Sequence, residues 1–428
     1  MKKFLGIVLV LALLLSCMAL PALAEEPLQL TMYFPVNVGG DAAKLIDQMT
    51  ADFNAENPDI QVQSVYTGNY DDTVTAIQTA IQGGNAPDLF VSLATQRFTM
   101  ADTKMAMPLD DLIAADPEGQ AFIDDFIDGF MLDSYVDGSI YSIPFQRSTM
   151  VMFYNKDAFA EVGLDPEAPP KNWDEMVEYA QKLTNENRYG VGIALNSGSA
   201  QWAFTGFSLQ NCTNGVGLMS ADGKEVYFNT PENIEALQLW LDLQNKYKCM
   251  APGIVQWTDL PTQFLAGEVA MIYHTTGNLT NIKNNATFDF GVCFLPAGRQ
   301  YGAPTGGGNF YITNGISEER QKAAWEFIKF CCSTERAAQW SIDTGYVATR
   351  ESCYETQLLK DYYESFPEAL VAYQQLPYAQ PELTTYSAAE MWRILNDNIQ
   401  AAVTGEMTAA EALEAAQQQG DDLLFDYQ

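Results

Sequence analysis

The stretch from Ser139 to Leu183 constrains the fold more than any other part of the chain. It holds an alternating apolar–polar segment at 140–144 and an apolar, β-rich segment at 150–154, and both patterns are typical of strands. Polar residues at 146–149 lie between these segments, and a helix start, a proline-rich break and a second helix from Trp173 follow. A polar joint before a new α/β run indicates a crossing between two domains. An ordinary strand–loop–strand inside one domain is the alternative.

The segments before this stretch alternate between strand and helix patterns. Strands are predicted at 28–34, 60–66 and 89–93, and apolar stripes predict helices at 41–54 and 71–82. This β-α-β-α-β order predicts a mostly parallel sheet with helices on its faces.

The middle of the chain repeats this logic, with an acidic amphipathic helix at the end. Helices are predicted at 173–186, 233–247, 260–266 and 408–425, and strands at 190–194, 269–273, 288–294 and 310–312. At 428 residues the chain is long enough for two domains of about 100–200 residues each.

The N-terminus is typical of an export signal. Lys2 and Lys3 precede an apolar run at 4–15, and the small residues around 22–24 fit a cleavage site before Glu25. We therefore predict a signal peptide over residues 1–24. The residues before Cys17 also resemble a lipobox, which is the alternative and would leave a lipid anchor on that cysteine. Both routes place the protein outside the cytoplasm, on the cell surface or in the periplasm.

The charge of the chain excludes some partners. A net charge of −33 argues against binding to nucleic acid and against adsorption to anionic membranes. It does not exclude a small anionic ligand, because surface charge is screened within about 8 Å and a few arginines can set the potential inside a cleft.

Cysteine and histidine patterns predict no metal site or cofactor. His274 is the only histidine, and no cysteine pair has metal-ligand spacing. Six cysteines follow Cys17, which permits disulfides in an exported chain without revealing their pairing. Adjacent Cys331 and Cys332 lie in an apolar helix pattern, and we expect them to be buried small hydrophobic residues.

The motifs favour a ligand-binding protein over an enzyme. The chain has no nucleophile-elbow pattern, no second histidine and no P-loop, so no catalytic residue is predicted. Several aromatic residues fall in loops or at element ends, where rings can stack on a sugar or glycerol face, although any one of them can instead belong to the core. They are Tyr70, Trp173, Trp202, Trp257, Tyr273 and Tyr346. Arg147 and Arg393 are candidates for binding phosphate or carboxylate.

The glycine run at 306–308 has two interpretations. Three glycines free their backbone N–H groups for close approach to an anion. The same run also suits a flexible turn between domains.

A family resemblance runs through nearly the whole chain. The stretch SIPFQRSTMVMFYNKDAFAEVGL and the motifs FNAENPDIQV, YTGNYDD, IQGGNAPDL, FLAGEVAM, FDFGVCFLPAG, GGGNFYIT and DTGYVATR occur in order. They resemble the extracellular solute-binding proteins of ABC importers, and within these the branch that binds sn-glycerol-3-phosphate. The resemblance implies a periplasmic-binding-protein-like type II α/β fold, with two lobes joined by hinge strands around a ligand cleft. It places the first lobe at 27–148 and 304–345, and the second at 149–303 and 346–428.

The resemblance also implies a set of ligand contacts. The matching residues are Tyr70 in YTGNY, Ser148 in PFQRST, Thr275 in YHTTGN, Gly307 in the glycine run, Tyr346 in TGY, Arg393 in MWRIL and Trp173 in PKNW. By analogy, Arg393, Ser148, Thr275 and the Gly307 N–H hold phosphate. The ligand hydroxyls are then bound by Tyr70 and Tyr346, with Trp173 in a stacking wall.

Two positions depart from the family pattern. Ala94 stands where an acidic residue is expected to bind the glycerol hydroxyls, and Arg147 replaces a smaller polar residue. A hydroxyl without its partner loses about 1–3 kcal/mol, so the ligand preference can differ.

These observations predict the substrate-binding component of an ABC importer, a monomer that captures a polyol phosphate by hinge closure and delivers it to a membrane permease. The ligand is expected to be sn-glycerol-3-phosphate or a glycerophosphodiester. A neutral sugar or oligosaccharide, with Trp173, Trp202 and Trp257 as the main wall, is the alternative. A secreted carbohydrate-active enzyme is the alternative from another class.

Overall fold

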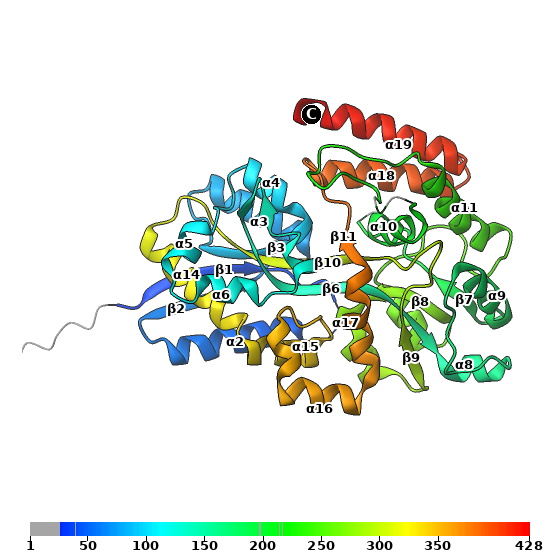
Figure 1. Ribbon diagram of the computed structural model, residues 1–428, viewed down its shortest axis with the longest axis horizontal. Coiled ribbons are helices and arrows are strands. Elements are labelled where there is room, and N and C mark those ends of the chain that lie inside the picture. Colours follow the sequence, from blue (N-terminus) through cyan, green and yellow to red (C-terminus); the bar gives the residue numbers. More distant parts are fainter. Residues whose placement is uncertain (1–25, 39, 197, 214, 216) are drawn as a thin grey trace, which may run out of the picture.

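The computed structural model describes residues 26–38, 40–196, 198–213, 215 and 217–428. The predicted signal peptide and the alternative lipid anchor at Cys17 lie outside the described residues. Two α/β lobes lie side by side, and the strands β6 and β10 run from one to the other (Figure 1). In the part of the chain that is described, no helix combines the length and the apolar character that a membrane span requires.

The first lobe is built on three parallel strands. β1 (Leu28–Phe34) lies between β2 (Ile60–Tyr66) and β3 (Leu89–Leu93), and α2 (Ala42–Glu56) and α3 (Tyr70–Gln82) connect them. The predicted β-α-β-α-β unit is confirmed, and its strand bounds are those predicted. Other elements of this lobe are η1 (Ala94–Gln96), α4 (Arg97–Asp102), α5 (Asp110–Ala115), α6 (Gly119–Asp124), α7 (Asp128–Met131), β4 (Tyr135–Val136), β5 (Ser139–Ile140), α14 (Glu318–Cys331) and α15 (Thr334–Thr344).

A single buried strand, β6 (Ile143–Asn155), joins the two lobes. Its first half pairs with β10 (Ala303–Ile312), and its second half pairs with β8 (Val269–Thr275) and β9 (Phe290–Cys293), all antiparallel. The prediction of two strands separated by a polar joint was therefore wrong. The polar residues 146–149 continue the strand because β10 pairs with their backbone, and the Thr149 hydroxyl donates to the Pro304 carbonyl at 3.0 Å.

The glycine run lies inside β10, so the interpretation of it as a flexible turn between domains was wrong. Gly307 has a φ of +92°, and a Cβ there would collide with the carbonyl oxygen of Gln146 on the paired strand. This φ and this close approach fit only glycine, and β10 changes its register against β6 nearby, between Gly308 and Asn309.

The second lobe places β8 beside the parallel strand β7 (Tyr189–Gly192). The sheet of the whole molecule is therefore mixed rather than mostly parallel, since every pairing of the crossing strands β6 and β10 in the central path is antiparallel. The other elements of the lobe are α8 (Lys156–Glu161), α9 (Trp173–Leu183), α10 (Ala200–Asn211), α11 (Pro231–Asn245), α12 (Leu260–Leu265), η2 (Thr276–Asn278), α13 (Leu279–Asn285), α18 (Ala388–Val403) and α19 (Ala409–Leu424).

Helices α18 and α19 pack together beside α10 and α11 on the outside of this lobe (Figure 1). A capping box at Thr408 and Glu411 starts α19. Between the lobes the chain forms α16 (Gln357–Ser365), α17 (Val371–Gln375) and β11 (Ala379–Pro381), which pairs with the start of β10.

The described cysteines are all free thiols. Cys331 ends α14 and is 2% exposed, and Cys332 is 1% exposed. The prediction that these two are buried hydrophobic residues is confirmed.

Candidate functional site

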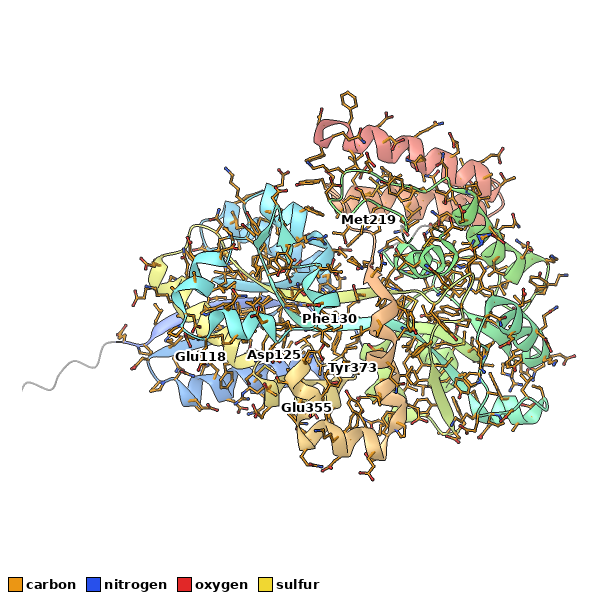
Figure 2. The ribbon with its side chains drawn as sticks, in the orientation of Figure 1. Glu118, Asp125, Phe130, Met219, Glu355 and Tyr373 are labelled. Atoms are coloured by element: carbon orange, nitrogen blue, oxygen red, sulfur yellow. The ribbon has the colours of Figure 1, made fainter. Side chains whose placement is uncertain are left out.

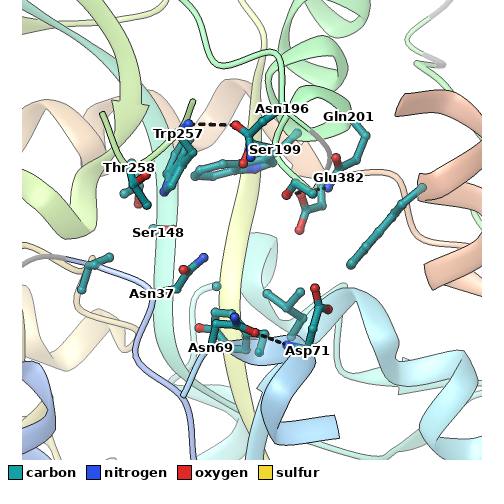
Figure 3. Close-up of a pocket in the computed structure, with 18 of the residues that line it drawn as sticks. Asn37, Asn69, Asp71, Ser148, Asn196, Ser199, Gln201, Trp257, Thr258 and Glu382 are labelled. Atoms are coloured by element: carbon teal, nitrogen blue, oxygen red, sulfur yellow. Dashed lines mark hydrogen bonds between the residues drawn. The ribbon is translucent and has the colours of Figure 1, made fainter. Parts of the chain in front are cut away.

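A cavity of about 280 Å³ lies between the lobes. This volume is near the lower end of the range for ligand pockets, about 300–1,000 Å³. Figure 3 shows Trp257 and Ser199 on one side of it and Asn69 and Asp71 on the other. Its described lining consists of Asn37, Val38, Asn69, Tyr70, Asp71, Leu93, Ser148, Asn196, Gly198, Ser199, Gln201, Trp202, Trp257, Thr258, Thr275, Gly307, Tyr346, Glu382 and Trp392.

The crossing strands supply the base of the cavity. Ser148 of β6 and Gly307 of β10 line it from the pair of strands that joins the lobes. Thr275 lies at the end of β8, where its hydroxyl oxygen accepts a hydrogen bond from the Gly277 amide at 3.1 Å. Strand backbone therefore holds these small polar groups in place without a loop.

Two tryptophans of the second lobe form one wall. The Trp202 and Trp257 rings are 5.4 Å apart, and the Trp202 indole N–H donates to the Thr305 carbonyl at 3.1 Å. The Trp202 ring lies against Gly306, where a Cβ would come within 2.7 Å of it. The glycine run thus gives a tryptophan room to lie against the strand.

The buried His274 side chain packs against Trp257 and fixes its position. Its imidazole stacks on the Trp257 ring at 3.7 Å, and its Nε2 lies 3.2 Å from the Trp257 carbonyl oxygen. Asn278 lies 2.9 Å from the other ring nitrogen. Burial lowers the pKa of His274 to about 3, so the ring is neutral at physiological pH.

A third tryptophan and two tyrosines complete the aromatic lining. Trp392 of α18 donates its indole N–H to the Leu383 carbonyl at 2.7 Å. The Tyr70 hydroxyl donates to the Gln146 side chain at 3.1 Å. Tyr346 stacks on Trp340 at 5.9 Å. Partners outside the cavity orient these rings before any ligand enters.

The charged groups of the lining are carboxyls. Asp71 lies in the first turn of α3, where burial and then the neighbouring Asp72 raise its pKa. Glu382 is 4% exposed, and its pKa is raised well above the usual range by burial and then by Asp133, against an opposing effect of Arg147. Among the described lining residues none is lysine, arginine or histidine. The site therefore offers hydrogen-bond acceptors and aromatic faces without a fixed positive charge.

Five of the eight predicted site residues meet in this cavity. They are Tyr70, Ser148, Thr275, Gly307 and Tyr346. They come from both lobes and from the strands between them, so sequence motifs far apart in the chain converge on one place.

Arg147 lies outside the cavity lining, although its neighbour Ser148 is part of it. Successive residues of a strand face opposite sides, and Arg147 is 0% exposed in a charged network behind β6. Its guanidinium donates to Asp133 at 2.7 Å and to the Asn309 side chain at 3.0 Å. It also lies 5.1 Å from the ring of Phe130, which Figure 2 labels near the junction of the lobes.

Trp173 and Arg393 also lie outside the cavity lining. The Trp173 indole donates to Gln210 at 2.7 Å, and its ring packs on Phe207. The Arg393 side chain is 55% exposed and pairs with Glu390 at 2.6 Å and Asp397 at 2.7 Å along α18. The structure thus gives each of these two residues other partners.

Sequence reasoning missed Trp392 and the two carboxyls. Trp392 was adjacent to the motif residue Arg393, and the helical pattern did not reveal which of the two faces the lobes. Glu382 lies in a short segment between elements, and no local pattern distinguishes it from the other acidic residues, of which the chain has 55 in all. Ala94 begins η1, is 1% exposed and adds no acid to the site.

Comparison with known proteins identifies similar chains. A family model described as bacterial extracellular solute-binding protein matches residues 48–367. The sn-glycerol-3-phosphate-binding periplasmic protein UgpB of Pectobacterium atrosepticum is 30% identical over 407 residues, which cover 90% of this chain and 89% of that protein.

Solved structures share the fold over nearly the whole chain. UgpB from Mycobacterium tuberculosis in complex with glycerophosphocholine has a TM-score of 0.81 at 24% identity and covers 94% of this chain and 98% of its own. The cyclic α-maltosyl-1,6-maltose binding protein from Arthrobacter globiformis has a TM-score of 0.80 at 23% identity and covers 94% and 100%. The predicted type II fold, two lobes joined by hinge strands, is confirmed.

Proposed function

Because the chain belongs to the bacterial extracellular solute-binding proteins, the substrate-binding components of ABC importers, we propose that it captures an uncharged carbohydrate or polyol. The observation that supports this ligand class is the cavity lining, with three tryptophans, two carboxyls and no basic side chain among its described residues. Aromatic faces pack against the C–H surface of a sugar, and carboxylate and amide oxygens accept hydrogen bonds from its hydroxyls.

A phosphorylated ligand is the second candidate. The residues that the family resemblance assigned to glycerol-3-phosphate, apart from Trp173 and Arg393, do meet in the cavity. The phosphate of sn-glycerol-3-phosphate, however, carries nearly two negative charges and that of a glycerophosphodiester carries one, and either would lie close to Asp71 and Glu382. Arg393, its proposed counter-charge, is already paired with two acids on an exposed helix face. We therefore rank the neutral solute first.

Capture is proposed to work by closure of the lobes. The cavity takes Asn69 and Tyr70 from one lobe and Trp202 and Trp257 from the other, so a bound solute touches both. A ligand that contacts both lobes binds the closed state more tightly and shifts the equilibrium toward it. The crossing strands β6 and β10 are the proposed hinge, and the lobe boundaries given above remain predictions.

We also propose that the chain is monomeric, is not an enzyme, and delivers its solute to the permease of an importer. The two cavity carboxyls serve as hydrogen-bond acceptors in this proposal. Release of product from a glycoside by the purified protein would instead favour a carbohydrate-active enzyme.

Isothermal titration calorimetry separates the two ligand classes. The neutral probes are maltose, maltotriose and ribitol, and the phosphorylated probes are sn-glycerol-3-phosphate and glycerophosphocholine. We expect a neutral probe to bind at least about tenfold more tightly than either phosphorylated one, a difference of about 1.4 kcal/mol. Binding of the phosphorylated probes alone, abolished in Arg393→Ala, would overturn the proposal.

A further inference from the structure

Glu382 occupies a central place in the molecule. It directly follows β11, the short strand that pairs with β10 where the chain crosses between the lobes. Its side chain lines the cavity, and the residue is only 4% exposed. Figure 3 shows it beside Ser199 and Gln201 and across the open space from Asp71. The carboxyl is therefore nearly enclosed by protein and directed into the space that a solute would fill.

No described residue donates a hydrogen bond to this carboxyl. Its own backbone carbonyl accepts one from the Thr384 hydroxyl at 2.8 Å, which holds the segment in place. Arg147 is close enough to influence Glu382, but its charge is already shared with Asp133 and Asn309. The donors that this carboxyl lacks in the protein must come from the cavity.

Burial of a carboxyl without hydrogen-bond donors lowers the stability of the free protein, unless a ligand supplies those donors. A buried polar group without a hydrogen bond loses the stabilisation it had in water, and the cost is larger for an ionised group. Asp71, the other cavity carboxyl, belongs to an exposed residue and keeps access to water, although partial burial raises its pKa. Glu382 is thus the lining group for which a ligand donor matters most.

We propose that the Glu382 carboxyl accepts hydrogen bonds from adjacent hydroxyls of the solute and makes the site selective for uncharged polyhydroxylated molecules. This inference rests on the proposed function and extends it to a specificity-determining residue. Two carboxylate oxygens match two neighbouring hydroxyl donors. When the carboxyl is ionised, these oxygens offer no donor to a phosphate and repel it, so one side chain both favours the sugar and disfavours its phosphorylated analogue.

Substitution of Glu382 tests the inference. Glu382→Gln keeps the shape and removes the charge, and Glu382→Ala removes both oxygens. Glu390→Gln is the matched control, because its carboxylate is half-exposed on the following helix, α18, and outside the cavity lining. Titration of each variant with maltose, maltotriose and ribitol gives the affinities, and thermal unfolding without ligand gives the stability.

We expect Kd for a neutral probe to rise about tenfold in Glu382→Gln, more in Glu382→Ala, and to be unchanged in Glu390→Gln. The preference for neutral over phosphorylated probes should narrow in Glu382→Gln. Its unfolding midpoint without ligand should equal or exceed that of the wild type, because a purely structural carboxyl would lose stability on substitution whereas an unsatisfied one would not.

The outcomes distinguish this inference from the proposed function. If the wild type binds a neutral probe and Glu382→Gln binds it equally well, the role of Glu382 is wrong and the proposed function stands. If the wild type binds only the phosphorylated probes, the proposed function fails, and the inference fails with it. Weaker binding accompanied by a lower unfolding midpoint in Glu382→Gln would assign the residue to structure rather than to the ligand.

Discussion

Two buried carboxyls near the centre of the molecule have opposite surroundings. Asp133 is 1% exposed and accepts hydrogen bonds from Arg97 at 2.8 Å, Arg147 at 2.7 Å and Thr305 at 3.3 Å. Glu382 is 4% exposed and receives none from the described residues. One carboxyl has all its partners within the protein, and the other lies against a cavity.

The difference separates a structural use of buried charge from a ligand-binding one. Asp133 compensates two buried guanidiniums behind the crossing strands, where removal of any member leaves an unpaired charge. Glu382 carries a cost in the free protein that a solute hydroxyl can remove. Proteins accept such local costs at functional sites, where stability is exchanged for binding.

Removal of the structural carboxyl should have the largest effect. Asp133→Asn leaves the buried Arg97 and Arg147 without a counter-charge, and we expect the free energy of unfolding to fall by about 3–5 kcal/mol. Urea denaturation measures it. The control Asp397→Asn breaks an exposed pair with Arg393 and should cost no more than about 1 kcal/mol. If the free energy of unfolding fell equally in Asp133→Asn and Asp397→Asn, Asp133 would not have the structural role described above.

The close pairing of β6 with β10 gives the next largest effect. Gly307→Ala places a methyl group against the Gln146 carbonyl at a positive φ, and we expect a loss of about 2–4 kcal/mol in unfolding free energy. Gly315→Ala has a similar φ of +85° with open space around it, and strain alone predicts about 1–2 kcal/mol. If the free energy of unfolding falls equally in both variants, the close approach of β6 is not the reason that position 307 requires glycine.

Two tryptophans extend the comparison to the aromatic groups. Trp257→Ala removes a ring of the cavity wall and should raise Kd for a neutral solute about ten- to a hundredfold, or about 1.4–2.8 kcal/mol. Trp173→Ala removes a ring that contacts Gln210 and Phe207 outside the cavity lining, and should leave Kd unchanged. Isothermal titration calorimetry on both variants measures Kd. A loss of affinity in Trp173→Ala would mean that Trp173 contacts the ligand after all.

The last effect concerns the pH dependence of stability. Burial and Asp133 raise the pKa of Glu382 against the opposing charge of Arg147, and Tyr70 is the other titratable group close to it. As pH rises above about 4.3 the unfolded chain loses this proton before the folded protein does, so Glu382 lowers stability progressively until its folded-state pKa is passed.

Glu382→Gln lacks this contribution. Its stability relative to the wild type should therefore increase with pH, by at most about 1.4 kcal/mol per unit. Urea denaturation of both proteins between pH 5 and pH 7 measures the difference. A difference that does not change with pH would mean that Glu382 titrates normally in the fold.

The sequence predicted elements with a periodic or continuously apolar pattern, and it misjudged buried strands that contain polar residues and glycines. β1, β2 and α2 show clear periodicity because one side of each meets the core, and β3 and β8 are apolar runs that are buried on both faces. In β6 and β10 the polar residues and glycines have most of their partners far along the chain, as between Thr149 and Pro304. No local pattern distinguishes such a strand from a polar loop.

The sequence predicted those site residues that belong to recognisable family motifs or are aromatic residues at element ends. Tyr70 and Tyr346 were placed by resemblance, and Trp202 and Trp257 were identified as aromatic residues suited to a sugar. The choice between Arg147 and Ser148 depended on the pairing of β6 with β10, which sets the face of each residue. Glu382 could be identified only from its burial in the folded protein, which no sequence pattern reveals.

A structure of the protein with a bound neutral solute tests the proposed role of Glu382 most directly. The measurement is the distance from the Glu382 carboxyl oxygens to the nearest ligand atoms. We expect ligand hydroxyl oxygens at about 2.5–3.0 Å from this carboxyl, with the sugar ring against Trp202 or Trp257. A ligand bound in the cavity that leaves Glu382 without a hydrogen bond, or a phosphate held there by Arg393, would contradict it.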